Sequence, residues 1–218
     1  YEYNPAGDIS LTKRNSAGVL QWEVSFDQTD MTKWEKATWV GTDNLGNVIV
    51  TGTLMSGYSN PVVAASIVMK FNSSGALLWR QVFESNFDGS QTKKCLIDEQ
   101  NNIYILGTGI NGSSGMNTKV KKLSPDGTPL WTYFNAIGMP LNIKFTPDNG
   151  IVVVGRGITG SVNGYAKLDR NGNAIWSLPS VFSTTTGDAA GDVFGNTYIV
   201  NLEYVFNSNN SLIKKISP

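Results

Sequence analysis

The sequence predicts an all-β fold made of four-stranded antiparallel units that are repeated along the chain. Three observations lead to this prediction. One ten-residue phrase recurs, strand-like runs alternate with turn residues between its copies, and no segment shows a sustained helical period. Self-similarity at roughly 40 to 50 residues is typical of arrays of identical supersecondary units. The repeat therefore determines the architecture more strongly than any single segment does.

The recurring phrase begins with lysine and ends with tryptophan. Its complete copies are KRNSAGVLQW, KFNSSGALLW, KLSPDGTPLW and KLDRNGNAIW, which start at Lys13, Lys70, Lys122 and Lys167, and a short copy, KISP, starts at Lys215. Each complete copy ends on a tryptophan, at Trp22, Trp79, Trp131 and Trp176. We expect the indoles to lie in the core as wedges between neighbouring units. We expect the lysine stems to pack along strands, with the ammonium groups at a turn carbonyl or in water; a phosphate-binding ring of lysines is the alternative.

One unit can be divided into four strands in chain order. In the unit that ends at Trp79, ATWVGT is followed by the turn DNLGN, the β-branched run VIVTGTL, a loop, AASIVMKF, the turn NSSG and ALLWRQVF. Runs rich in valine and isoleucine favour strands. Asp or Asn near Gly supplies the positive φ angles of tight hairpins. The next two units repeat this order, and the last one supplies only DAAG, TYIVNLEY and SLIKKI as strands.

Units of this kind are expected to pack around a common axis as the blades of a β-propeller, because one blade cannot bury both of its faces. We predict a single domain over residues 1–218 with four or five blades, or a fragment of a larger ring. The repeats are expected at 8–26 (partial), 37–83, 93–135, 141–180 and 188–218 (partial).

The two ends of the chain leave ring closure open, because a third strand is expected at both 8–14 and 210–216. A four-bladed ring would leave residues 1–16 outside it. A five-bladed ring would use YEYNP as an extra strand. In the third alternative, further chain or another copy completes a fragment. Tyr1 is not a methionine, so we expect a processed or excised chain.

Composition limits the classes of partner. Seventeen basic and seventeen acidic residues cancel, so no nucleic-acid partner is expected. No apolar run approaches the ~18 residues that span a bilayer, so no membrane insertion is expected. Histidine is absent, which removes the commonest general base. Cys95 is the single cysteine and is expected to be a small buried hydrophobe.

The candidate ligand-binding residues come from the innermost strands and from the loops. Aligning the innermost strands on their hairpins places Trp39, Lys94, Asn142 and Asp188 at one position, which we expect to face the central channel. The next position, occupied by Val40, Cys95, Ile143 and Ala189, should alternate into the core. A solvated channel wall is the alternative for the first set. Loop aromatics that could stack on a sugar or anchor a protein are Trp34, Tyr58, Phe87, Phe182, Tyr204 and Phe206; packing under their own loops is the alternative.

Four aspartates could suggest catalysis or calcium binding, but their spacing indicates turns. Asp43, Asp98, Asp148 and Asp192 occur one per unit, so we expect them to be spread around the ring as turn-forming residues. Glycosidases need two carboxylates close together, and the channel position offers only Asp188. We therefore expect no catalytic residue, no metal and no cofactor.

The hairpin D-x-x-G-N, with the downstream K-x-x-x-x-G-x-x-x-W, resembles the bacterial β-propeller repeat family of secreted and envelope proteins, and more loosely the blades of pyrroloquinoline-quinone-type propellers. The resemblance covers nearly the whole chain. It implies an extracellular or cell-envelope location and a scaffold or interaction role without a shared catalytic residue. The calcium ligands and vicinal cysteine pair of the quinone enzymes are missing here, so their activity is not carried over.

The expected function is that of a non-catalytic module that binds a protein or a glycan through the loop face. One alternative is a polysaccharide hydrolase or lyase with its site in the central funnel. The other is a structural subunit of a surface assembly that self-associates through unpaired terminal strands.

Overall fold

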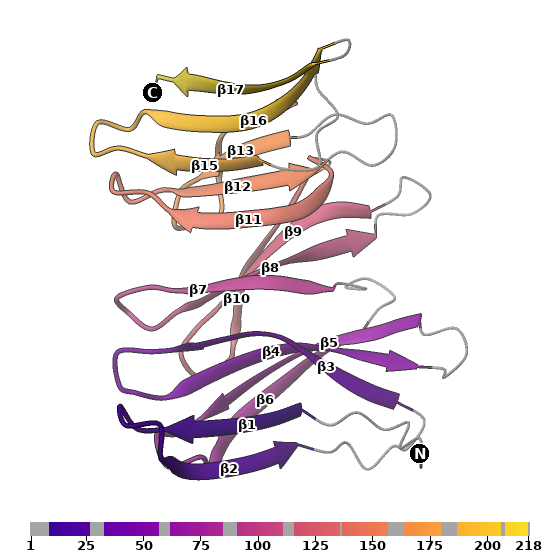
Figure 1. The fold of residues 1–218 in the computed structure, drawn as a ribbon, viewed down its shortest axis with the longest axis vertical. Coiled ribbons are helices and arrows are strands. Elements are labelled where there is room, and N and C mark those ends of the chain that lie inside the picture. Colours follow the sequence, from indigo (N-terminus) through magenta and orange to yellow (C-terminus); the bar gives the residue numbers. More distant parts are fainter. Residues whose placement is uncertain are drawn as a thin grey trace.

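The structure is a computed structural model that describes residues 9–26, 33–56, 62–84, 91–110, 116–135, 137–156, 164–179, 187–205 and 208–217. Every regular element in these residues is a β-strand, and every strand pairing is antiparallel. The strands form five sheets that follow one another from one end of the molecule to the other (Figure 1). The predicted architecture of antiparallel blades is confirmed.

The sheets are numbered here in chain order. The first sheet contains β1 (Ile9–Arg14) and β2 (Leu20–Phe26). The second contains β3 (Lys33–Thr42), β4 (Val48–Ser56), β5 (Val62–Phe71) and β6 (Leu77–Glu84). The third contains β7 (Thr92–Ile97), β8 (Ile103–Ile110), β9 (Met116–Leu123) and β10 (Pro129–Asn135). The fourth contains β11 (Met139–Phe145), β12 (Ile151–Arg156), β13 (Gly164–Leu168) and β14 (Ala174–Pro179). The fifth contains β15 (Gly187–Gly191), β16 (Thr197–Val205) and β17 (Ser208–Ile216).

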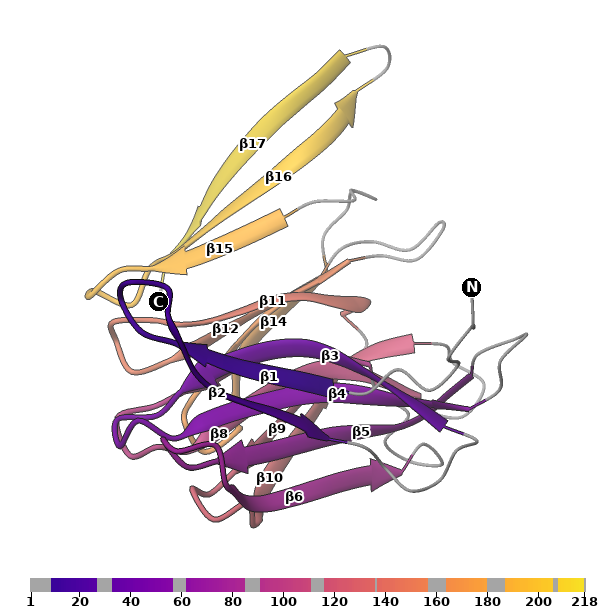
Figure 2. The ribbon, with the colours of Figure 1, turned by 60° about the horizontal axis from the view of Figure 1, so that its bottom comes forward.

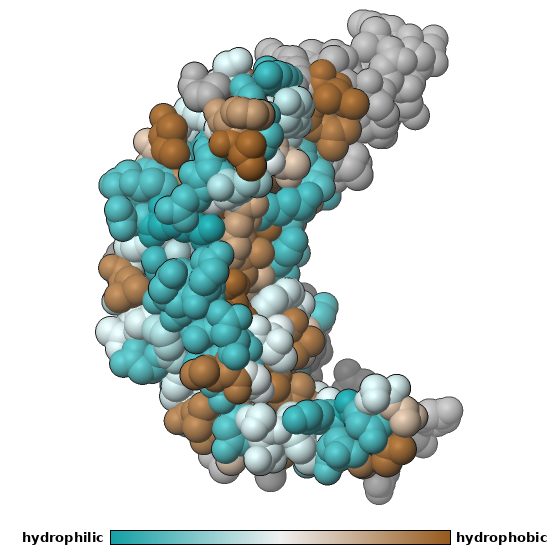
Figure 3. Space-filling model, turned by 90° about the vertical axis from the view of Figure 1, so that its left-hand side faces the viewer, coloured by the Kyte–Doolittle hydropathy of each residue, from teal (hydrophilic) through white to brown (hydrophobic). Residues whose placement is uncertain are grey.

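The five sheets form an open arc rather than a closed ring over the described residues (Figure 3). Strand β3 lies against β7, β7 lies against β11, and β11 lies against β15, so the first strands of successive sheets line the inside of the arc. In the fifth sheet, β15 lies closest to β11 and β12, and Ile199 of β16 also packs with Val152 and Val154 of β12. Figure 2 shows β16 and β17 diverging from the rest of the molecule.

The apolar core is divided among the four junctions between successive sheets. At the junction of the second and third sheets, Ile49 and Val68 pack with Cys95, Ile103 and Leu123. Cys95 is buried as predicted, and burial raises the pKa of its thiol to about 12. The thiol therefore stays protonated at neutral pH and contributes as a small hydrophobe.

In three of the four complete phrases, the lysine and tryptophan of one sheet donate hydrogen bonds to the same backbone carbonyl in the next sheet. These bonds measure 2.9 to 3.2 Å. The donor pairs and their acceptors are Lys13 and Trp22 with Ser73, Lys70 and Trp79 with Pro125, and Lys122 and Trp131 with Arg170. The ammonium groups meet turn carbonyls, as one of the two expectations had it, whereas the indoles are partly buried at the junctions rather than within the core. The spacing of the phrase thus delivers two donors to one acceptor.

The glycine of the phrase packs against the tryptophan ring of the previous sheet. Gly75, Gly127 and Gly172 have φ angles of +89°, +88° and +87°, a region that favours glycine. A Cβ on Gly127 would stand 3.0 Å from the Trp79 ring, and one on Gly172 would stand 2.7 Å from the Trp131 ring. The phrases that start at Lys70 and Lys122 therefore do both: their lysine and tryptophan contact the next sheet, and their glycine packs against the tryptophan of the previous sheet.

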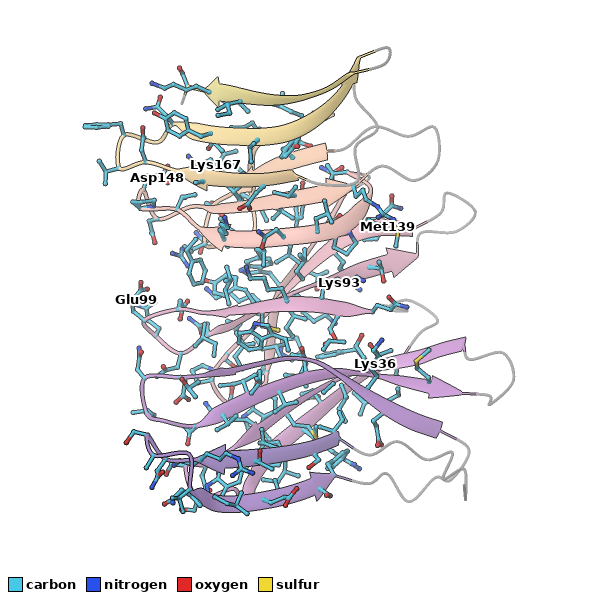
Figure 4. All side chains as sticks on the ribbon, viewed as in Figure 1. Lys36, Lys93, Glu99, Met139, Asp148 and Lys167 are labelled. Carbon is cyan, nitrogen blue, oxygen red and sulfur yellow. The ribbon has the colours of Figure 1, made fainter. Side chains whose placement is uncertain are left out.

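The turn aspartates act on their own hairpins, as predicted for Asp43, Asp98 and Asp192. In each case Oδ1 accepts hydrogen bonds from the backbone N–H groups two and four residues further on, at 2.8 to 3.0 Å. Asp43 also forms an ion pair with Lys70 at 2.8 Å. Asp148 accepts from Lys167 Nζ at 2.6 Å (Figure 4). Asp43, Asp98 and Asp192 thus stabilise their turns, and Asp43, Asp98 and Asp148 pair with repeated lysines.

Candidate functional site

Three neighbouring inner strands carry polar side chains that are joined in one hydrogen-bonded row. Lys94 Nζ on β7 donates to Asn142 Oδ1 on β11 at 2.7 Å. Asn142 Nδ2 donates to Asp188 Oδ1 on β15, also at 2.7 Å. Lys144 Nζ on β11 forms an ion pair with Asp188 Oδ2. These four residues, named the inner-strand row below, connect the third, fourth and fifth sheets along the inside of the arc.

A β-bulge precedes the predicted channel position in three of the four inner strands. The irregularities fall between Ala37 and Trp39 in β3, between Thr92 and Lys94 in β7, and between Pro140 and Asn142 in β11. In β15, Asp188 pairs with Val200 in regular register. An extra residue changes the direction of the side chain that follows it, and bulges are common beside functional sites. The bulges therefore help to turn Lys94 and Asn142 toward the next sheet.

The bulge of β7 lies at the loop end of the inner strands. In Figure 4, Lys93, the residue before Lys94, lies in the same part of the molecule as Lys36 and Met139, away from the hairpin that carries Glu99. Lys94 thus lies near the start of β7, away from the hairpin that joins β7 to β8.

The environment of Asp188 keeps its carboxylate charged. Burial acts to raise the pKa of Asp188, but hydrogen bonds from Lys144, from the Ala189 backbone and from Asn142 outweigh it, and the pKa is lowered. The Ala189 N–H donates to Asp188 Oδ1 at 2.9 Å. At neutral pH this group is an acceptor and an anion, not a proton donor.

The row remains accessible and retains hydrogen-bonding capacity. The side chains of Lys144 and Asp188 are 37 % and 43 % exposed. Lys94 uses one of its three ammonium hydrogens within the row, and Asn142 uses one of its two amide hydrogens. With two ammonium groups and one carboxylate, the row offers mainly donors to a ligand.

The row contains three of the four predicted channel residues and one residue that the sequence analysis missed. Trp39 is not part of it: its indole packs with the core at the junction of the second and third sheets, over Gly41, where a Cβ would stand 2.1 Å from the ring. Lys144 was missed, although it lies two residues after Asn142 and hence on the same face of β11. Side-chain alternation along the strand was the signal that could have found it.

The predicted core position is wrong at Val40. Cys95, Ile143 and Ala189 are buried as expected, but Val40 is 56 % exposed. The other three pack against the second and third strands of the preceding sheet. The first sheet has only β1 and β2 among the described residues, and these strands match the third and fourth strands of the other sheets. Nothing in the described chain therefore covers Val40.

None of the six expected loop aromatics has a described side chain, and two of them lie in strands rather than in loops. Trp34 lies in β3 opposite Met55, and Tyr204 lies in β16 opposite Asn209, but only their backbones are described. Tyr58, Phe87, Phe182 and Phe206 lie outside the described residues.

A small recess between the second and third sheets is another feature of the described residues that could hold a ligand. It is lined in part by Phe83, Thr92, Lys119 and Lys121, and its cavity volume of ≈ 20 Å³ holds about one water molecule. Ligand sites for small organic molecules are roughly ten times larger or more. Burial, with a smaller effect from the Lys121 charge, lowers the pKa of Lys119 to about 8. The recess is too small to be the primary ligand site.

Within the described ranges, no three His, Cys, Asp or Glu side chains gather as a group that could hold a metal. No helix long and apolar enough to span a membrane occurs in the part of the chain that the structure describes.

No protein-family model and no curated protein match the sequence. Among solved structures, a protein of unknown function from Bacteroides caccae is similar over 97 % of this chain and 73 % of its own, with a TM-score of 0.50 and 10 % identity. The β-propeller domain of the Trilobed protease from Pyrococcus furiosus, described as having an open velcro topology, matches 84 % of this chain and 56 % of its own, with a TM-score of 0.50 and 9 % identity.

A GH43 β-1,3-galactosidase matches 88 % of this chain and 48 % of its own, with a TM-score of 0.50 and 12 % identity. The present chain thus spans about half the length of two of these three proteins. At such identities the similarity concerns the fold alone, and it identifies the fold as that of a β-propeller.

Proposed function

We propose that the protein is a non-catalytic binding module and that its inner-strand row binds a glycan. The observation that carries this proposal is the hydrogen-bonded row itself, in which Lys94, Asn142 and Asp188 come from three successive sheets. Side chains held by their neighbours lose little conformational freedom on binding, which favours recognition.

The chemistry of the row favours a ligand that is rich in oxygen acceptors. Lys94, Asn142 and Lys144 keep donor hydrogens available, and the hydroxyl and carboxylate oxygens of a sugar can accept them. The charge balance of two ammonium groups against one carboxylate favours neutral or acidic sugars over basic ligands.

A polysaccharide hydrolase is the second candidate, and the position of Asp188 on an inner strand favours it. Hydrolases of this kind normally use two carboxyl groups, one of which has a raised pKa so that it can act as an acid. The pKa of Asp188 is lowered, and its partner across the row is Lys144 rather than a second carboxyl group. We therefore favour binding without cleavage.

The test is an array of neutral and uronic-acid-containing oligosaccharides, followed by calorimetric titration of the best binder. Asn142→Ala should weaken binding about tenfold, since one lost hydrogen bond of about 1.4 kcal/mol has that effect. Asn171→Ala, in an exposed turn, is the matched control and should bind like the unmodified protein. Equal affinity of all three proteins would contradict the assignment.

A reducing-end assay separates binding from cleavage. No release of reducing ends is expected from any bound oligosaccharide. Release by the unmodified protein, with loss in Asp188→Asn, would replace the binding module by the hydrolase.

An extracellular or cell-envelope location belongs to the same proposal. It is supported by the resemblance of the repeated phrase to secreted and envelope propellers, and fractionation of cells that express the native gene would test it.

A further inference from the structure

The outer face of the fifth sheet has the composition of a buried junction, although no described residue covers it. Tyr198 and Val200 on β16 and Ile213 on β17 point to this face, which we name the forward face. Ile213 is 72 % exposed, and Tyr198 and Val200 are 39 % and 40 % exposed. Exposed aliphatic side chains grouped on one face of a sheet indicate a surface that another element is suited to cover.

The strand register shows that the same positions are buried in the three complete sheets. Ile213 pairs with Val200, as Val68 pairs with Thr51, Val120 with Leu106 and Tyr165 with Val154. Val68 and Val120 are 0 % exposed and Tyr165 is 2 % exposed, because the following sheet covers each of them. The forward face is therefore the equivalent of three surfaces that this protein covers with a further sheet.

The forward face matches the third sheet in its polar groups as well. Tyr198 donates to Asp192 at 3.2 Å, and Tyr104 donates to Asp98 at 3.0 Å. The Lys215 ammonium lies 5.9 Å from the Tyr198 ring, and the Lys122 ammonium lies 4.8 Å from the Tyr104 ring. The sequences agree too, since KKISP at 214–218 repeats KKLSP at 121–125.

The fourth sheet shows what covers such a face. Its Phe145 contacts Tyr104 edge to face, with ring centroids 5.2 Å apart. Its Arg170 guanidinium lies 5.8 Å from the Tyr104 ring, and the Arg170 carbonyl accepts hydrogen bonds from Lys122 and Trp131. Its Ile143 joins the apolar cluster at this junction.

The outward face of the first sheet does not offer this chemistry. Ser10 and Thr12 on β1 and Glu23 on β2 are exposed there, and Ser10 donates to Glu23. A polar outer face is typical of a capping repeat. Head-to-tail stacking of a second copy would therefore place polar groups against the forward face.

We propose that the forward face is a docking surface for a further β-sheet of the same repeat, with the chemistry of the fourth sheet. That sheet supplies an aliphatic residue to Val200 and Ile213, an aromatic ring and a guanidinium to Tyr198, and a backbone carbonyl to Lys215. The binding is an interaction between sheets, and Asp188 of the inner-strand row, which pairs with Val200, lies at the inner edge of the same face.

The repeat allows a direct test, because Pro218 aligns with Pro125. Appending a copy of residues 126–179 after Pro218 would add a copy of β10 to the fifth sheet and then a copy of the fourth sheet against the forward face. We expect the extended chain to unfold in urea at a higher midpoint than the 218-residue chain. We also expect amide exchange of β16 and β17 to slow by at least tenfold.

Substitution of Ile213 by lysine is the specific control. In the 218-residue chain Ile213→Lys should leave the urea midpoint nearly unchanged, because the side chain is already exposed. In the extended chain it should remove the gain in protection. Ile175→Lys, on β14, changes another side chain that is 58 % exposed and should affect neither result.

Two outcomes would overturn the proposal. In the first, the appended sheet leaves exchange in β16 and β17 unaltered, or Ile213→Lys does not reduce the protection that it provides. In the second, the 218-residue chain sediments as a dimer that Ile213→Lys dissociates and Ile175→Lys does not, which would make a second copy the occupant.

Discussion

Lys70 and Trp79, which lie opposite each other on β5 and β6, donate hydrogen bonds to one carbonyl oxygen, that of Pro125 in the next sheet. Both bonds measure 3.1 Å. Lys70 also forms an ion pair with Asp43. One lysine therefore joins the β3–β4 hairpin of its own sheet to the β9–β10 hairpin of the following sheet. The contact combines a packed indole, two hydrogen bonds and an ion pair, and its strength can be divided by substitution.

Replacing Trp79 by phenylalanine should remove the hydrogen bond to Pro125 and keep most of the packing. The expected loss is about 1 to 2 kcal/mol in the free energy of unfolding, and Trp79→Ala should cost about 3 to 5 kcal/mol. Urea unfolding monitored by far-UV dichroism measures both values. Equal losses for the two variants would contradict the role of the aromatic packing.

Gly127→Ala should destabilise the protein more than Gly18→Ala. Both glycines have positive φ angles, +88° and +79°, so both substitutions carry a backbone cost of about 1 kcal/mol. Only Gly127 has an indole 3.0 Å from the position of a Cβ, whereas no atom lies within 4 Å at Gly18. The difference between the two variants in urea unfolding therefore measures the packing of Trp79 on Gly127. The absence of a difference would argue against that contact.

Acid should weaken the Asp43–Lys70 ion pair. Burial tends to raise the pKa of Asp43, but hydrogen bonds from Lys70, Asn47 and Leu45 outweigh it and lower the pKa. Since the folded-state pKa lies below that of the unfolded chain, this stabilisation is complete above the unfolded value and is lost as the pH falls through the folded value. Urea midpoints measured from pH 6 to pH 2 should decline less steeply in Asp43→Asn; an identical slope would count against the pair.

Lys119 should make stability rise with pH in alkaline solution. Burial lowers the pKa of Lys119 to about 8 from 10.5, so the unfolded chain binds more protons than the folded protein between those values. Stability attributable to this group should therefore increase from about pH 8 to about pH 10.5. Urea midpoints of the unmodified protein and Lys119→Met over this range test it, because the increase should be larger in the former; Lys121 and Lys122, whose pKa values burial also lowers, contribute equally to both. NMR titration of the Lys119 Cε resonance gives the pKa directly.

The repeated phrase predicted the sheets and the junctions at which the indoles pack. It could do so because its residues form turns and strands within a few positions of themselves. Turn aspartates such as Asp98 could be recognised from their spacing to the hairpin glycine or asparagine. The phrase also predicted a turn carbonyl or water as the partner of each lysine. It did not reveal that lysine and tryptophan share that carbonyl, because the acceptor is a backbone atom about 40 to 60 residues away.

The inner-strand row was predicted in part. Alignment of the strands identified Lys94, Asn142 and Asp188, because equivalent positions in a repeat face the same way. It also included Trp39, whose large ring instead packs over Gly41 into the core. A full prediction of the row would have needed the positions of the β-bulges. One inserted residue changes the direction of a side chain, and it leaves no clear mark in a single sequence.

The exposure of Val40 has a different cause. Alternation along β3 assigned it to the correct face, but whether a face is buried depends on the sheet beside it. In the described residues the first sheet contains only β1 and β2, which correspond to the third and fourth strands of the other sheets. No second strand is present there to cover Val40. Sequence patterning predicts the face of the strand to which a side chain points. Whether that face is buried depends on the neighbouring sheet.

The copies of the phrase that start at Lys70 and Lys122 contain both a donor end and a receiving end, and this has a consequence for how the gene can change. Tandem duplication of a single repeat would create a complete new junction on both of its borders, without any compensating point mutation. Loss of a repeat would likewise rejoin two compatible neighbours. The length of such a protein can thus vary between lineages by recombination alone, while the pattern of contacts at every seam stays the same.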